Sequence, residues 1–175
     1  MPLHIVFFEL IVDPACSIAF EAEPEEPGIM TRRPRSPNAR LFRSSALAIG
    51  ILQGLGVFAA VLSAFSLALR WGHLPEDARA IAFTSLVAGN LALIWANISS
   101  STVFETIRTP NLALWLVTLG TITSLFVILY VPYMRGVFQF SVLHGDDLLI
   151  AFSLGAASIT WCEILKLIRP RLQRA

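Results

Sequence analysis

Residues 46–69 read ALAIGILQGLGVFAAVLSAFSLAL, a run of 24 residues without a charged side chain. A helix needs about 20 apolar residues to cross the hydrocarbon core of a bilayer, so this stretch predicts a transmembrane helix. Four more apolar segments predict spans: 3–20, 80–96, 112–131 and 148–162. The two shorter ones reach spanning length through polar or snorkelling ends. We therefore predict an all-α, polytopic membrane bundle of five transmembrane helices.

The overall composition agrees with a membrane protein. The chain has 175 residues, of which 55% are hydrophobic and only 14% charged, with a mean hydropathy of +0.69. A soluble domain would carry about a quarter charged residues. The formal net charge is +1, so the chain lacks the strong positive charge with which proteins bind nucleic acid. The lipid bilayer is the partner that the composition favours, and no nucleic-acid partner is expected.

The positive charges are divided unequally between the loops, and this predicts the orientation. Ten of the 13 basic residues fall on one side of the predicted spans and three on the other. Because cytoplasmic loops carry the excess of Lys and Arg, segment 3–20 should run from outside to inside. The C-terminus should then be cytoplasmic, in a bacterial plasma membrane. The ten are Arg32, Arg33, Arg35, Arg40, Arg43, Arg108, Lys166, Arg169, Arg171 and Arg174, and the three are Arg70, Arg79 and Arg135.

Two acidic residues interrupt the first apolar segment. Glu9 and Asp13 are four residues apart, which places both on one face of a helix, and Pro14 follows directly. An ionisable side chain near the bilayer centre costs ~2.5–3.5 kcal/mol. Pro14 has no N–H, so the carbonyl of Leu10 loses its helical donor. Hard cations are bound by such oxygens, so Glu9, Asp13 and Leu10 are predicted to bind a transported cation.

This predicted ion site is incomplete within the chain. A calcium-like ion takes ~6–8 oxygen ligands, more than two carboxylates and one carbonyl supply. The other four predicted spans carry no second acid near their centre. The remaining ligands should therefore come from another part of a larger assembly.

Other polar and small residues in the spans predict packing. Gln53 and Asn90 are isolated amides on successive predicted helices, and we expect each to hydrogen-bond between helices. The spacing Gly50-x-x-x-Gly54 allows two helices to approach closely in lipid. Segment 21–45 contains four prolines and changes from acidic to basic, which predicts an extended loop. We therefore expect three regions: a broken transmembrane helix at 1–20 that carries the two acids, a cytoplasmic loop at 21–45 and a four-helix C-terminal membrane support domain at 46–175.

Several motifs together resemble one protein family. ELIVDP at 9–14, FEAEP at 20–24 and GIMTRRPR at 28–35 resemble the sixth transmembrane helix of P-type cation-transporting ATPases and the loop that follows it. EILK at 163–166 is similar to the end of the tenth helix in the calcium-pump branch. The resemblance covers essentially the whole chain. It implies that the five spans correspond to helices six to ten.

The resemblance also implies roles for single residues. Asp13 would be the central carboxylate of the ion site, and Glu9 would contribute where calcium pumps have an amide. Val12 replaces an expected hydroxyl residue, and Val87 falls where calcium pumps place an acid on the eighth helix. These departures leave calcium, another hard cation or a proton as the transported ion.

Catalytic motifs of the family do not occur in these 175 residues. There is no Asp-Lys-Thr-Gly-Thr phosphorylation motif and no Thr-Gly-Glu motif. ATP and magnesium are therefore expected on the missing N-terminal pump half, and no cofactor is expected in this chain. Whether the chain takes part in an enzyme stays open at this point. The alternative is a small interaction or regulatory subunit without transport activity of its own, and a neighbouring reading frame that encodes the phosphorylation motif would favour the pump.

Overall fold

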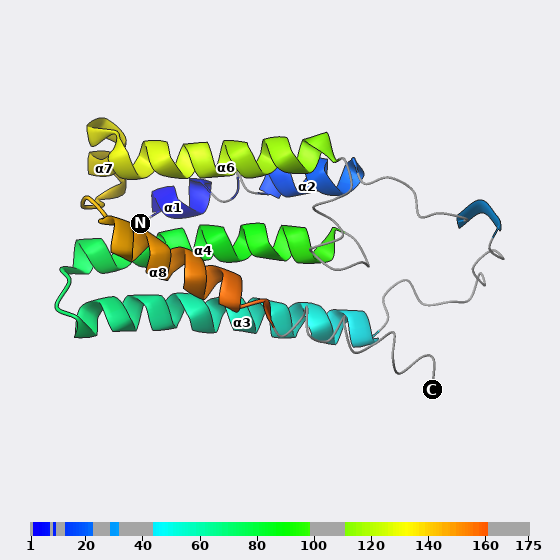
Figure 1. Cartoon of the computed structure of the whole chain (residues 1–175), viewed down its shortest axis with the longest axis horizontal. Coiled ribbons are helices and arrows are strands. Elements are labelled where there is room, and N and C mark those ends of the chain that lie inside the picture. The colour runs from blue at the N-terminus through cyan, green and yellow to red at the C-terminus, as the bar shows by residue number, and fades with distance from the viewer. Residues whose placement is uncertain are drawn as a thin grey trace.

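The computed structural model describes residues 2–7, 9, 13–22, 29–31, 44–98 and 111–160. Helices make up its elements, and no strand occurs in these ranges, which confirms the predicted all-α class (Figure 1). The elements are α1 (Pro2–Phe7), α2 (Asp13–Glu21), a one-turn 3-10 helix (Ile29–Thr31), α3 (Ser44–Arg70), α4 (Pro75–Asn97), α6 (Leu112–Tyr130), α7 (Pro132–Phe138) and α8 (Gly145–Ala157).

Three helices of the described part, α3, α4 and α6, are long and apolar enough to cross a membrane. They correspond to the predicted spans 46–69, 80–96 and 112–131. The predicted span 3–20 contains two shorter helices, α1 and α2. The predicted span 148–162 begins within α8, and its residues from 161 onward lie outside the described part. The chain is thus an integral membrane helical bundle.

Two helices begin earlier than hydropathy predicts, because carboxylates cap their first turns. The Leu74 N–H donates to Asp77 Oδ2 at 3.3 Å, and α4 starts at Pro75, where proline's missing N–H costs nothing. The His144 N–H likewise donates to Asp147 Oδ2 at 3.2 Å at the start of α8. A prediction based on uncharged residues ends the span at such acids. In the structure these acids instead stabilise the first turn of the helix.

Helix α7 lies between the last two predicted spans, in a stretch where hydropathy predicts no span. It runs from Pro132 to Phe138, and Gln139, which caps its C-terminus, adopts the left-handed conformation with φ 54°. Phe138 and Phe140 are both buried, and their ring centroids lie 6.2 and 5.4 Å from Phe83 of α4. These two aromatic residues therefore pack on a neighbouring helix.

Helix α4 lies at the centre of the bundle and contacts α3, α6 and α8 (Figure 1). Its contact with α8 depends on Gly155, where an added Cβ would lie 2.7 Å from the Ala88 side chain and 2.8 Å from the Ser85 carbonyl oxygen. At Gly50 and Gly54, by contrast, no atom lies within 4 Å of an added Cβ. The predicted glycine motif of α3 therefore makes no close helix contact within the described part.

Polar side chains connect α4 to α3 and α6 near the C-terminal end of α4. Gln53 Nε2 donates to Asn97 Oδ1 at 3.0 Å, and Asn97 Nδ2 donates back to Gln53 Oε1 at 3.3 Å. Trp95 Nε1 donates to Thr118 Oγ1 of α6 at 3.0 Å. The predicted interhelical hydrogen bond is confirmed for Gln53. For Asn90 it is wrong, because Asn90 Nδ2 donates to the Leu86 carbonyl of its own helix.

Candidate ion-binding site

The two acids stand in the first apolar segment, of which α1, Glu9 in a π-helical conformation and α2 are described, and residues 8 and 10–12 lie outside the description. Helix α1 ends at Phe7, Asp13 is the first residue of α2, and Glu9 lies between the two helices. Pro14 is the second residue of α2, a position in the first turn where its missing N–H has no helical partner to lose. The proline ring would clash with the carbonyl four residues earlier, so the sequence favours a new helix start here over a continuous span.

The predicted ligands are described only in part. Glu9 and Pro14 are both exposed. The Leu10 carbonyl and the Asp13 carboxylate lie outside the residues whose placement can be described. In the described ranges, no three His, Cys, Asp or Glu side chains are arranged to hold a metal ion. The exposed Glu9 therefore stands on a surface that this part of the chain leaves uncovered.

An aromatic cluster holds α1 in the bundle. The His4 ring lies 5.4 Å from Phe83 of α4 and 5.0 Å from Phe140, centroid to centroid. Phe7 is buried and lies 5.5 Å from Phe83 and 6.3 Å from Phe138 of α7. Edge-to-face aromatic pairs of this kind are worth about 0.5–1.5 kcal/mol beyond area burial. The cluster fixes the helix that leads to Glu9.

Helix α2 is held from a different side, along α6 (Figure 1). Ala19 is fully buried, and Cys16 is half-buried against the apolar core. Ile18 and Phe20 point away from the core and are exposed. Helices α1 and α2 are therefore anchored separately, α1 on α4 and α7, and α2 on α6.

Helix α4 brings no carboxylate toward this segment. Val87, where the resemblance leads one to look for an acid, is fully buried and offers no side-chain oxygen. Thr84 and Ser85 are also fully buried, and the Thr84 hydroxyl donates to the Ala80 carbonyl at 2.8 Å. The Ser85 hydroxyl has no hydrogen-bond partner in the described part. No pattern in the sequence marks Ser85, since serine in an apolar helix usually bonds to its own backbone.

Membrane helices with two acids and a proline in one apolar segment define a class of integral membrane proteins that includes ion transporters. Comparison with known families makes this specific. The sequence model described as "Cation transporting ATPase, C-terminus" matches residues 1–168. The chain belongs to this family, and it represents the C-terminal membrane region of a P-type cation-transporting ATPase of the calcium-pump-like branch.

Individual relatives agree with the family assignment. A protein named calcium-transporting ATPase 1 from Lactococcus lactis is 26% identical over 171 residues, which are 95% of this chain and 19% of that protein. A calcium-transporting ATPase of Bacillus subtilis is 24% identical over 159 residues, 89% of this chain and 18% of that protein. One of Listeria monocytogenes is 27% identical over 174 residues, with shares of 97% and 19%. The chain thus spans about a fifth of the length of these relatives.

Proposed function

We propose that this chain is the ion-pathway and supporting membrane part of a cation pump. Glu9 and Asp13 contribute carboxylate oxygens to the transported cation, and the Leu10 carbonyl contributes a further oxygen where Pro14 interrupts the helix. Helices α3 to α8 act as the scaffold. Calcium is the first candidate ion because the relatives are named for it, and another hard cation or a proton is the alternative.

One observation carries this proposal: two acids, four residues apart and followed by Pro14, lie in the first apolar segment of a chain that belongs to the cation-transporting ATPase family along 168 residues. A break in a membrane helix frees backbone carbonyls and concentrates oxygen ligands, as in other transporters. The exposure of Glu9 supports a site that a second part of the pump completes. That second part, the N-terminal pump half, would bind ATP and magnesium and carry the phosphorylation cycle.

The orientation of the chain belongs to the same proposal. The ten-to-three division of basic residues places the loop 21–45 and the C-terminus in the cytoplasm. The turn between α3 and α4 and the α7 region then face the outside. Under this orientation α1 enters from the outer face, and α2 leads to the cytoplasmic loop of a bacterial plasma membrane protein.

The decisive experiment replaces the central carboxylate in the assembled pump. Asp13→Asn should abolish ion-dependent phosphorylation and transport, because the amide removes a negative charge from the ion and keeps the side-chain shape. Glu9→Gln should weaken the apparent ion affinity. Glu21→Gln is the matched control, since Glu21 is an exposed acid at the far end of α2. Full ion-dependent phosphorylation in Asp13→Asn would refute the proposed role.

A further inference from the structure

Helix α7 does not continue the axis of α6, although only Val131 lies between the two helices. Val131 has φ −75° and ψ 120°, an extended conformation, and Pro132 follows as the first residue of α7. The chain therefore turns at the end of α6, and Figure 1 shows α7 at that end of the bundle, across the line of α6. Because α6 is long and apolar enough to cross a membrane, α7 begins where the span ends, at the level of a bilayer interface.

The side chains of α7 divide into an exposed face and a buried face. At about 100° per residue, positions 132, 133, 136 and 137 share one side of a helix. All four are exposed, Tyr133 by 74% and Val137 by 43%. On the other side, Phe138 is buried, and Met134 and Arg135 are half-buried. The exposed face thus carries no charge, and the one charged residue of this helix lies away from it, which is the reverse of a helix that faces water.

The exposed apolar surface of α7 is continuous along the chain with that of α6. Phe126 and Tyr130, in the last turns of α6, are each 43% exposed, and their rings are stacked with centroids 5.7 Å apart. Leu116 and Leu119 of the same helix are 60% and 58% exposed. Lipid covers the exposed side of a membrane-spanning helix, so the same lipid is next to the face of α7 that follows.

Aromatic residues at this end of the bundle have the chemistry of the membrane interface. Tyr133 combines an apolar ring with a polar hydroxyl group, and such side chains are enriched where the bilayer meets water. The turn between α3 and α4 lies at the same end of the bundle as α7 (Figure 1), and it carries Trp71, which is 58% exposed. An exposed tryptophan and an exposed tyrosine on two different connections are consistent with one interface level.

We propose that the face of α7 formed by Tyr133 and Val137 rests in the interface of a phospholipid bilayer, with both side chains at the boundary between acyl chains and headgroups. Helix α7 is then a lipid-contacting helix at the end of the transmembrane bundle. Water covers the start of α8, where Asp146 is exposed. This contact goes beyond the proposed ion site and does not depend on it.

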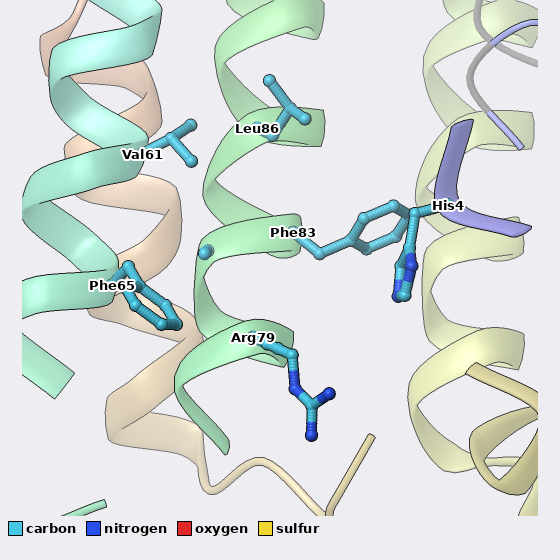
Figure 2. Close-up of a pocket in the computed structure, with 7 residues that line it drawn as sticks. His4, Val61, Phe65, Arg79, Phe83 and Leu86 are labelled. Carbon is cyan, nitrogen blue, oxygen red and sulfur yellow. The ribbon is translucent and has the colours of Figure 1, made fainter. Parts of the chain in front are cut away.

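The buried face of α7 connects the lipid contact to α1. The Phe138 ring lies 6.3 Å from Phe7 of α1 and 6.2 Å from Phe83 of α4, centroid to centroid. Figure 2 shows the Phe83 ring pointing from α4 toward His4 of α1, beside a groove of about 300 Å³. Helix α7 therefore stands between the lipid and the aromatic cluster that holds α1.

The test places a fluorescent label on α7 of the full chain in phosphatidylcholine vesicles. Cys16→Ala and Cys162→Ala remove the native thiols, and Val137→Cys is labelled with an environment-sensitive nitrobenzoxadiazole dye. Its emission should shift to shorter wavelength, and it should lose intensity when the vesicles contain phosphatidylcholine with a nitroxide near the headgroup end of an acyl chain. Asp146→Cys with the same dye is the matched control, since Asp146 is exposed in the first turn of α8. This control should lose intensity to iodide in the water and little to the nitroxide lipid.

Two results would overturn the lipid contact. Iodide quenching of the Val137→Cys label as strong as that of the control would place the face in water. Protection from both quenchers would show that protein covers the face, and loss of this protection on dilution of the protein in lipid would identify a second copy of the chain as the cover. If circular dichroism shows that Val137→Cys does not fold, Tyr133→Cys labels the same face and should give the same lipid quenching. None of these measurements involves an ion, so the proposed function is decided separately.

Discussion

Two glycines of this molecule have opposite surroundings: Gly155 is in close contact with another helix, and Gly120 faces open space. At Gly155 the missing side chain lets α8 touch the backbone of α4, where the Gly89 nitrogen would lie 2.9 Å from an added Cβ. At Gly120 in α6 nothing lies within 4 Å. A methyl group is therefore excluded by backbone atoms at the first position and accommodated at the second.

This contrast predicts a pair of alanine variants. Gly155→Ala should lower the free energy of unfolding by about 1–3 kcal/mol, because backbone atoms cannot move aside as a flexible side chain could. Gly120→Ala should leave stability unchanged or raise it by up to about 1 kcal/mol through helix propensity. Unfolding of the purified chain in mixed micelles, titrated with a denaturing detergent, measures both. Equal stability of the two variants would contradict the α4–α8 contact.

At the scale of helix elements, the reciprocal amide pair between α3 and α4 predicts a coupling. Gln53 is 8% exposed, so removing Asn97 leaves its amide without a partner. In a double-mutant cycle of Gln53→Leu and Asn97→Leu, the coupling energy should be about 0.6 kcal/mol and at most about 1.7 kcal/mol, the range found for such bonds in membranes. The same cycle with Asn90→Leu is the control and should give no coupling, since Asn90 bonds within its own helix.

The capping carboxylate of α8 allows a second prediction at this scale. Asp147 accepts the His144 N–H, and its side chain is only 10% exposed, with one oxygen 3.5 Å from His73 Nε2. Asp147→Ala should therefore lower stability by about 0.5–2 kcal/mol, as expected for a lost cap. The adjacent Asp146 is exposed, so Asp146→Ala should cost less than about 0.5 kcal/mol. Thermal unfolding in detergent compares the two variants, and an equal loss in both would exclude the cap as the cause.

Hydropathy predicted α3, α4 and α6 because an apolar run of spanning length must satisfy its own backbone hydrogen bonds in a bilayer, and a helix does this. It missed α7, since a seven-residue helix has no such run and depends on the tertiary burial of Phe138. The partner of Gln53 was equally out of reach, because Asn97 is 44 residues away and only the crossing of two helices joins them. Of the candidate ion site, the helix break that Pro14 predicts lies next to residues outside the described part, so the break and the roles of the two acids remain proposals.

At the scale of the whole molecule, the bundle separates support from function. Helix α4 is the buried centre, whereas the first apolar segment, which carries Glu9, lies at the side and is held by aromatic contacts. Phe83 is the residue that joins the two, since its ring meets both His4 and Phe7 of α1. The position of α1, and with it the position of Glu9, should therefore depend on this one side chain of the scaffold.

Phe83→Ala tests this dependence, because Phe83 is 6% exposed and its loss opens a cavity beneath α1. Unfolding should become easier by about 3–5 kcal/mol, and in the assembled pump the apparent ion affinity should fall as well, since α1 no longer has a fixed position. Phe58→Ala is the matched control: Phe58 on α3 is 61% exposed and should move neither quantity. A less drastic variant, Phe83→Leu, retains most of the apolar volume and should separate the two effects by restoring stability more fully than ion affinity, because leucine fills the space without the edge-to-face ring contacts. If Phe83→Leu restored both equally, the cluster would act only as a filler of volume, and the link from α4 through α1 to Glu9 would be wrong.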